Sequence, residues 1–280
     1  MTPMSSSNAP LIGVFDSGIG GLSVLRAIRD QLPAQPVIYF GDQAHVPYGA
    51  RSLDEVRGFS RAVVRFLLGR GAKLIVVACN TASVAALHKL REEFPSIPFV
   101  GMEPAVKPAA EQTRSGIVGV LATYATFQGE MYASVVERFA KGVTLLQDPC
   151  FGLVGEIEKG NLNGPETRAI LERVLGPMLA KGIDTVVMGC THYPFVIPLI
   201  QQIAGPDVRV IDPAPAIARQ TRRLLDAHDL LALDDRPAEV QFYTSGSPED
   251  FSKLLVQLLG ETHPVAQAVW QDPDRLITKP

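Results

Sequence analysis

Two short stretches of the chain match each other: Val76-Val77-Ala78-Cys79-Asn80-Thr81 and Val186-Val187-Met188-Gly189-Cys190-Thr191-His192. Each is an apolar, β-branched run that ends in a cysteine followed by polar residues. Such a run is typical of a buried strand in a parallel sheet, where functional groups gather at the carboxyl end. Gly71 and Gly182 each lie eight positions before their cysteine (79 − 71 and 190 − 182). The pair therefore predicts one site built from two related halves, each of which contributes a thiol.

Two further pairs of segments indicate an internal duplication. Ile12-Gly13-Val14-Phe15-Asp16-Ser17 resembles Val118-Gly119-Val120-Leu121-Ala122-Thr123, and Val100-Gly101-Met102-Glu103-Pro104-Ala105 resembles Arg209-Val210-Ile211-Asp212-Pro213-Ala214. The offset between halves is nearly constant, at 106 (118 − 12), 111 (190 − 79) and 109 (209 − 100). This period is too long for a solenoid repeat. Strands of parallel sheets resemble one another in general, but here the Gly, Cys and Pro positions also match, which favours duplication.

Apolar strands alternate with amphipathic helices along the chain, which predicts βαβ units and parallel sheets. We expect an α/β protein with two similar parallel-sheet α/β domains related by internal duplication, and an active site in the cleft between them. Residues 1–103 plus 214–280 would form the first domain and residues 104–213 the second. The expected strands are 11–15, 37–40, 74–78, 97–100, 117–122, 143–147, 185–188, 208–211 and 240–244, and the expected helices are 22–31, 53–70, 82–94, 127–139, 153–159, 165–181, 196–204, 215–228 and 248–259.

Length and composition limit the possible classes of protein. A chain of 280 residues suffices for one large or two medium domains. Its formal net charge of −3, without a polybasic block, does not indicate binding to nucleic acid or to a membrane surface, and no apolar run is long enough to span a bilayer. Residues 1–8 lack the basic start and apolar centre of a signal peptide, which predicts a frayed tail and a cytoplasmic protein. The three cysteines do not suggest a disulfide framework, so their thiols would remain reduced.

A glycine-rich turn, Asp16-Ser17-Gly18-Ile19-Gly20-Gly21, follows the first expected strand. A dinucleotide site would need a third glycine where Ser23 stands, and Asp16 would repel a pyrophosphate. We interpret the turn as a place where backbone N–H groups at a helix N-terminus bind a small anion such as a carboxylate. A tight strand–helix connection without a ligand is the alternative.

The two matched cysteines, Cys79 and Cys190, are the strongest candidates for chemistry. A metal site would need more ligands than these segments supply, and a nucleophile–base pair of Cys with His is possible. The symmetry instead suggests one thiol on each face of a flat intermediate, which is what racemisation at a carbon atom requires. Cys150 has no matched partner and is interpreted as structural.

Auxiliary acid–base groups accompany both thiols in the sequence. His192 follows Cys190 by two residues, and Asp16 opens the equivalent turn of the other half. A free thiol has a pKa of about 8.5, so a nearby base must favour the thiolate. A hydrogen-bonded core histidine and a helix-capping aspartate are the alternatives. Glu158 is a further carboxylate candidate, although a solvated helix face explains it almost as well.

Taken together, the motifs resemble those of the glutamate racemases, within the cofactor-independent aspartate/glutamate racemase superfamily. The resemblance extends from about Leu11 to Ala214. It is carried by Val14-Phe15-Asp16-Ser17-Gly18-Ile19-Gly20-Gly21-Leu22-Ser23-Val24-Leu25, Tyr39-Phe40-Gly41-Asp42, Val46-Pro47-Tyr48-Gly49, Ala78-Cys79-Asn80-Thr81-Ala82 and Gly189-Cys190-Thr191-His192-Tyr193-Pro194.

The resemblance implies a mechanism and a set of site residues. Cys79 and Cys190 would be the two catalytic bases, assisted by Asp16 and His192, without pyridoxal phosphate and without a metal. Glu158 matches a family carboxylate near the second cysteine. The family makes D-glutamate for bacterial peptidoglycan, and many members are homodimers. The amino-acid site would be lined by Asp16, Ser17, Tyr48, Gly49, Asn80, Thr81, Thr191 and His192.

Other functions remain open at this stage. An aspartate or hydantoin racemase of the same superfamily would use the same thiols. A non-catalytic amino-acid-binding module would need the anion-binding turns but not both cysteines. A thiol hydrolase would leave the second cysteine unexplained. The matched thiols therefore favour a racemase.

Overall fold

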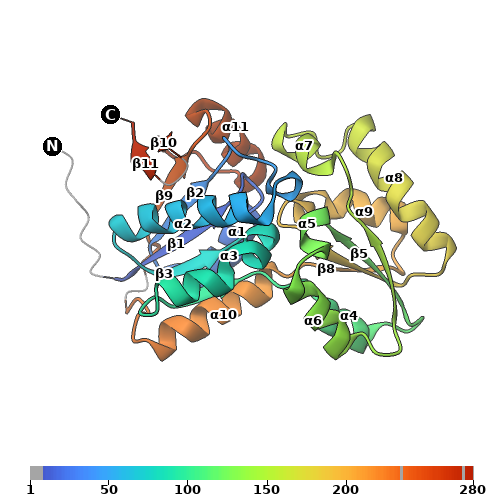
Figure 1. The fold of residues 1–280 in the computed structure, drawn as a ribbon. Helices are drawn as coiled ribbons and strands as arrows, with labels where there is room; N and C mark the ends of the chain where they lie inside the picture. Colours follow the sequence, from blue (N-terminus) through green and yellow to red (C-terminus); the bar gives the residue numbers. More distant parts are fainter. Residues whose placement is uncertain (1–8, 234–235, 273–274, 280) are drawn as a thin grey trace.

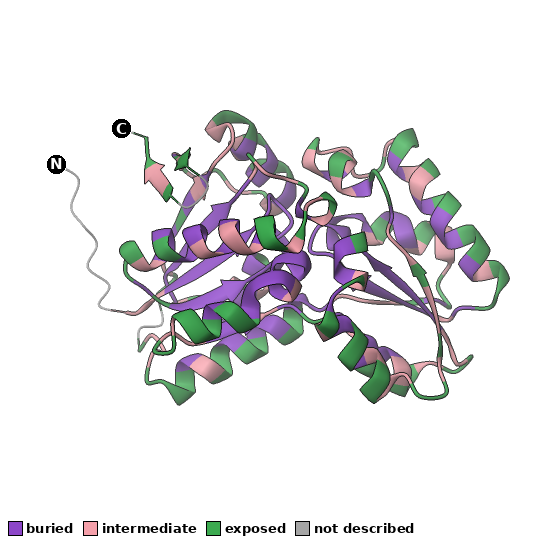
Figure 2. Ribbon diagram, viewed as in Figure 1, coloured by how far each residue is buried: buried purple, intermediate pink, exposed green. Residues whose placement is uncertain are grey.

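The computed structural model describes residues 9–233, 236–272 and 275–279, so the tail expected at residues 1–8 lies outside the described residues. Two α/β domains lie side by side, each with a sheet flanked by helices on both faces (Figure 1). The central strands of the two sheets are the most completely buried elements, whereas the edge strands are partly exposed (Figure 2). The predicted class, two parallel-sheet α/β domains, is thus confirmed. No described helix is both long and apolar enough to cross a membrane.

The first sheet combines strands from both ends of the chain, in the order β11-β10-β9-β2-β1-β3-β4. All neighbours pair in parallel except β10 and β11, which are antiparallel. The C-terminal strands therefore extend the N-terminal sheet on its β2 side. The strands are β1 (Leu11–Asp16), β2 (Val37–Gly41), β3 (Ala72–Val77), β4 (Phe99–Gly101), β9 (Val240–Thr244), β10 (Val265–Asp272) and β11 (Arg275–Thr278).

The second sheet has the order β6-β5-β7-β8, which repeats the order β2-β1-β3-β4 of the first. The ladders also correspond, because Ile12 pairs with Leu74 and Val118 pairs with Thr185. This equal topology supports the inferred duplication. The strands are β5 (Ile117–Ala122), β6 (Thr144–Asp148), β7 (Thr185–Gly189) and β8 (Arg209–Ile211).

Two details refine the match between the halves. Gly71 and Gly182 both adopt the left-handed conformation, with φ of 91° and 83°, which glycine accommodates without steric cost. The alignment of the segment at Val100 with the segment at Arg209 is shifted by two residues. In the sheets, Val100 pairs with Val76, and Ile211 pairs with the equivalent residue Val187. Val100 thus corresponds to Ile211 and not to Arg209. The proline match misled the alignment because the chain between strand and proline is two residues shorter in the second half.

Helices follow most strands and cover the two sheets. Helix α2 begins with a capping box, in which Ser52 accepts from the Glu55 N–H and Glu55 accepts from the Ser52 N–H. Helix α10 packs along α1 and so belongs with the first sheet. The helices are α1 (Leu22–Gln31), α2 (Leu53–Gly69), α3 (Asn80–Glu93), α4 (Val106–Gln112), α5 (Tyr124–Phe127), α6 (Glu130–Phe139), α7 (Leu153–Glu158), α8 (Pro165–Ala180), α9 (Ile197–Ala204), α10 (Ala214–Ala227) and α11 (Pro248–Leu259).

Three features differ from the sequence-based expectation. The single helix expected at 127–139 is two helices, α5 and α6, separated at Gln128 and Gly129. A Cβ at Gly129 would overlap the Val84 side chain, so this break lets α3 approach closely. Helix α4 and strands β10 and β11 were not anticipated, because α4 is short and has Pro108 in its first turn and the two strands are only partly buried.

Candidate active site

The two matched cysteines meet at a small cavity of about 10 Å³ between the domains. Cys79 follows β3 and Cys190 follows β7, and the two residues are only 5% and 6% exposed. This is the crevice outside the carboxyl ends of parallel strands, where open α/β sheets bind their ligands. The cavity is lined by Ser17, Pro47, Tyr48, Gly49, Cys79, Asn80, Thr81, Thr123, Val154, Cys190, Thr191 and His192.

Cys79 is the N-cap of α3, and its Sγ accepts a hydrogen bond from the Ala82 N–H at 3.4 Å. Its Sγ also lies 4.0 Å from Ser17 Oγ. Burial raises the pKa of the Cys79 thiol well above its usual value, and the negative charge of Asp16 adds to this, while the Ala82 N–H opposes it. The neutral form of the Cys79 thiol is therefore favoured, and a base must accept its proton when it ionises.

Asp16 lies behind the cavity wall and is fully buried at the end of β1. Its Oδ2 accepts from the Gly18 N–H at 3.0 Å, and its Oδ1 accepts from the Thr191 hydroxyl of the other domain, also at 3.0 Å. Burial raises the pKa of this carboxyl, against the opposing effect of His192 and the two hydrogen bonds. Gly21, and not Asp16, is the N-cap of α1, so the helix-capping alternative does not hold.

Cys190, His192 and Glu158 form a line of contacts. His192 Nδ1 lies 3.8 Å from Cys190 Sγ, and its Nε2 lies 2.6 Å from Glu158 Oε1. Burial lowers the pKa of His192, but its contacts with Cys190 and Glu158 outweigh this, so the pKa lies well above the usual value. Burial raises the pKa of Glu158. Its hydrogen bonds, above all the one with His192, outweigh this effect, so the pKa lies below its usual value. The Glu158 side chain is only 11% exposed, so it does not lie on a solvated face.

The glycine-rich turn does bind a carboxylate, but that carboxylate belongs to the protein. The Ile19 N–H donates to Glu158 Oε1 at 2.8 Å. A Cβ at Gly18 would overlap Glu158 Oε1, and a Cβ at Gly20 would overlap the His192 ring. The two glycines are therefore required because side chains of the second domain approach the turn this closely.

Thr123 is a site residue that the sequence analysis missed. Its Oγ1 lies 2.9 Å from the hydroxyl of Thr81 in the first domain and 2.9 Å from that of Thr126. The duplication contained the signal, since Thr123 occupies the position of Ser17 in the repeated segment. The remaining predicted binding residues, Ser17, Tyr48, Gly49, Asn80, Thr81, Thr191 and His192, all line the cavity.

Asn80 has the clearest capacity to bind a polar ligand. It is buried at the cavity wall, and neither Oδ1 nor Nδ2 has a hydrogen-bond partner among the described residues. Buried side-chain amides in native proteins are nearly always paired, so an unpaired one indicates a partner outside the chain. The amide offers both a donor and an acceptor, which suits a carboxylate together with an ammonium group.

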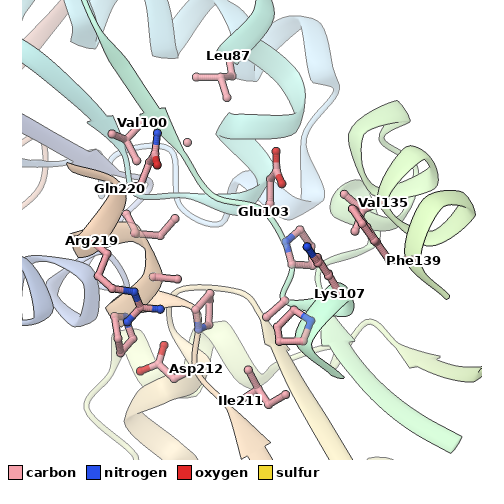
Figure 3. Close-up of a pocket in the computed structure, with 18 of the residues that line it drawn as sticks. Leu87, Val100, Glu103, Lys107, Val135, Phe139, Ile211, Asp212, Arg219 and Gln220 are labelled. Atoms are coloured by element: carbon pink, nitrogen blue, oxygen red, sulfur yellow. The ribbon is translucent and has the colours of Figure 1, made fainter. Parts of the chain in front are cut away.

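A larger hollow of about 650 Å³ lies elsewhere, where the chain crosses between the domains (Figure 3). Glu103, Lys107, Asp212 and Arg219 are among the charged side chains around it. Neither matched cysteine lines it, so its size does not make it the site of proton transfer. Within the described parts of the chain, no three or more His, Cys, Asp or Glu residues are grouped as metal ligands.

The fold and the site define a class: an α/β enzyme of two like domains that each present a buried thiol, backed by a carboxylate and an imidazole, to one cavity. The Asp/Glu/Hydantoin racemase family model matches residues 12–221. The chain belongs to this family and is an amino-acid racemase, as the resemblance of its motifs predicted.

Individual relatives cover nearly the whole chain. The glutamate racemase of Pseudomonas paraeruginosa is 50% identical over 264 residues, 94% of this chain and 99% of the relative. The glutamate racemase structure from Bacillus anthracis matches with a TM-score of 0.82 at 33% identity, over 91% of this chain and 96% of that one. The Escherichia coli structure, a complex with L-glutamate and the activator UDP-MurNAc-Ala, matches with a TM-score of 0.80 at 34% identity, over 97% and 100%.

Proposed function

We propose that this protein interconverts L-glutamate and D-glutamate by a two-thiol mechanism that needs no cofactor. The observation that carries the proposal is that Cys79 and Cys190, from different domains, line one buried cavity. The glutamate racemases to which the chain is similar support glutamate as the substrate. Aspartate and hydantoin racemases of the same superfamily are the nearest alternatives, whereas a binding module would not need both thiols.

The reaction moves one proton off the α-carbon and another onto its opposite face. With L-glutamate, the Cys190 thiolate removes the α-proton and becomes a thiol, and the electron pair stays on the substrate as a flat carbanion. The Cys79 thiol then donates its proton to the other face and becomes a thiolate. D-glutamate reacts by the reverse path. Asp16 and His192 exchange protons with their neighbouring thiols to restore the starting state.

The auxiliary groups reduce the cost of forming the thiolate. A proton transfer between groups of unequal pKa costs about 1.36 kcal/mol for each unit of mismatch. The raised pKa of His192 brings this group closer to the range of a thiol, which favours proton exchange with Cys190. Hydrogen bonds from Asn80 and the neighbouring threonines to the substrate carboxylate stabilise the charge that develops in the transition state.

The small cavity implies that the domains separate to admit the substrate. A volume of about 10 Å³ has room for about one water molecule, far below the ~300 Å³ at which ligand pockets usually begin. Glutamate must therefore enter by a movement that opens the space between Cys79 and Cys190. Closure around the substrate would exclude water from the thiolate and the carbanion.

The biological setting belongs to the proposal as well. The product would supply D-glutamate for peptidoglycan, in the cytoplasm, and the active form would be a homodimer. We propose domain boundaries near residues 103 and 214, because both sheets are complete within these limits and α10 packs on the first domain.

A single experiment tests the reaction. The purified protein is incubated with L-glutamate in deuterated buffer, and optical rotation and α-deuterium content are followed together. We expect the rotation to decay to zero while deuterium enters the product, both in untreated enzyme and after treatment with EDTA or hydroxylamine. L-aspartate, as the matched control, should react at least tenfold more slowly. Retained rotation with glutamate, or loss of activity on EDTA that zinc restores, would contradict the proposal.

A further inference from the structure

We propose that Trp270, on β10, and Ser245, just after the end of β9, are positioning residues that hold Tyr48 in the substrate site through the buried carboxylate of Asp42. The inference rests on the proposed function, because Tyr48 is one of the residues that line the catalytic cavity. It assigns a role to a part of the chain that the family model does not reach, since that model ends at residue 221.

Asp42 is the centre of this arrangement and is completely buried. Its Oδ2 accepts from the Tyr48 hydroxyl at 2.7 Å and lies 2.9 Å from His45 Nδ1. Its Oδ1 accepts from the Ser245 hydroxyl at 2.6 Å and from the Trp270 indole N–H at 2.8 Å. Each oxygen therefore has two partners. Those of Oδ2 lie in the loop of residues 42–50, and those of Oδ1 lie in the C-terminal segment, residues 240–272. A buried carboxylate is tolerated only with such full pairing.

The substrate loop, residues 42–50, connects Asp42 to the cavity. Pro47, Tyr48 and Gly49 all line the cavity wall. The Tyr48 hydroxyl donates to Asp42, so this hydrogen bond anchors the buried ring. This part of the wall is therefore anchored at Asp42, which does not itself line the cavity.

The C-terminal segment holds this loop at several points. Ser245 Oγ accepts from the Ala44 N–H at 2.9 Å while it donates to Asp42. Thr244 Oγ1 donates to Gln43 Oε1 at 2.9 Å. The Trp270 ring contacts the Phe59 and His45 rings edge-on, with centroids 5.6 Å and 4.9 Å apart. Strands β9 and β10 place these side chains because they extend the sheet beside β2.

Loss of one donor should act on substrate binding more than on proton transfer. The Asp42 oxygen left with one donor instead of two would regain a second donor by shifting, and the loop that carries Tyr48 would shift with it. The two thiols follow the ends of β3 and β7 and lie outside this loop. An interaction that holds substrate and transition state equally changes KM and leaves kcat nearly unchanged.

The test compares Trp270→Phe and Ser245→Ala with the wild-type enzyme. Each variant removes one donor to Asp42, and we expect KM for both glutamate enantiomers to rise roughly three- to tenfold, with kcat within about twofold of wild type. The Kd for D-glutamate, measured by calorimetry, should rise by the same factor. Val269→Ala is the matched control, because Val269 is an exposed neighbour of Trp270 on the same strand, and the KM of this variant should stay unchanged.

A double-mutant cycle separates positioning from a general loss of stability. Tyr48→Phe removes the hydroxyl that Asp42 accepts, so in that background Trp270→Phe should change Kd by less than about twofold. The inference would be overturned if Trp270→Phe raised Kd by the same factor in the wild-type and Tyr48→Phe enzymes. It would also be overturned if neither Trp270→Phe nor Ser245→Ala changed Kd. If Trp270→Phe does not fold, Ser245→Ala carries the cycle. A wild-type enzyme that binds D-glutamate without racemising it would contradict the proposed function and leave this test intact.

Discussion

The surroundings of single residues decide which proton transfers this site can perform. Cys79 is buried beside the negative charge of Asp16, which raises the pKa of its thiol, whereas Cys190 faces the His192 ring, which carries a raised pKa of its own. The two halves thus solve the same problem with different partners, a carboxylate in one and an imidazole in the other. Ala122 stands where the duplication would place a second aspartate.

The first prediction concerns the three cysteines. Cys79→Ser and Cys190→Ser should each lower the racemisation rate by about 10²–10⁴-fold, because each removes a proton-transfer group. Cys150→Ser should stay near wild type, since Cys150 does not line the cavity and its Sγ donates to the Asp148 carbonyl oxygen at 3.7 Å. Polarimetry with both enantiomers measures the rates. Normal racemisation by either of the first two variants would show that the two-thiol assignment is wrong.

The second prediction concerns direction. A substrate that loses a β-leaving group after deprotonation, such as threo-3-chloroglutamate, requires only the abstracting base. Cys190→Ser should still eliminate chloride from the D-configured substrate and fail with the L-configured one, and Cys79→Ser should show the reverse. Asp16→Asn should impair mainly the D-configured reaction and His192→Asn mainly the L-configured one. Chloride release is the measurement, and equal losses with both enantiomers in every variant would argue against one thiol per face.

At the scale of elements, short polar anchors hold strand ends in place. Asp184, just before β7, accepts from the Thr113 and Thr185 hydroxyls and from the Arg114 and Ser115 N–H groups. Partial burial raises the pKa of Asp184, but these four hydrogen bonds outweigh this effect and lower the pKa to about 2. The carboxylate thereby ties β7 to the segment that leads into β5, the neighbouring strand of the second sheet.

The third prediction follows from this pKa. Asp184→Asn should lower the free energy of unfolding by about 1 kcal/mol at pH 7, a value reduced for solvent screening. The folded pKa of about 2 lies below the unfolded value of about 3.9, so the contribution is present above pH ~4 and is lost as the pH falls toward 2. Urea titrations at pH 7 and pH 2.5 measure the difference. Asp207→Asn, at an exposed position, is the control, and a loss that does not depend on pH would contradict the prediction.

At the scale of the whole molecule, the domains touch through the same residues that serve the site. Glu158 binds the Ile19 N–H and Gln43 Nε2 of the first domain, and Thr191 donates to Asp16. Opening of the cavity must break such contacts, and closing must restore them. Substrate entry and the arrangement of His192 are therefore physically coupled.

The fourth prediction tests this coupling with Gly18→Ala. The added methyl group would overlap Glu158 Oε1, separating it from the Ile19 N–H and disturbing its contact with His192. We expect the free energy of unfolding to fall by about 1–3 kcal/mol and kcat to fall at least about tenfold. Urea unfolding and polarimetry measure the two effects. In Gly58→Ala the methyl group meets open space and Ala favours the helix, so that variant should keep its kcat and lose no stability. An unaltered Gly18→Ala enzyme would rule the coupling out.

The amino-acid pattern alone was sufficient for much of this fold. The expected bounds of α1, β5, β9 and α11 agree with the structure, because the periodic spacing of apolar residues and the Gly and Pro signals at their ends are local. The two cysteines could be assigned to strand ends for the same reason. Since parallel strands present their carboxyl ends at one edge of a sheet, residues after β3 and β7 could be expected near a cleft.

Only the tertiary structure decided how the two domains complete each other's site. Glu158 pairs with His192 and binds the glycine turn of the other domain, and Asp42 accepts hydrogen bonds from Ser245 and Trp270 near the C-terminus. Neither relation has a local signature, because a carboxylate on a short helix or in a loop looks the same in sequence whether it faces water or a partner. Its role depends on distances across the domain interface and the sheet, which are set by packing over the whole chain.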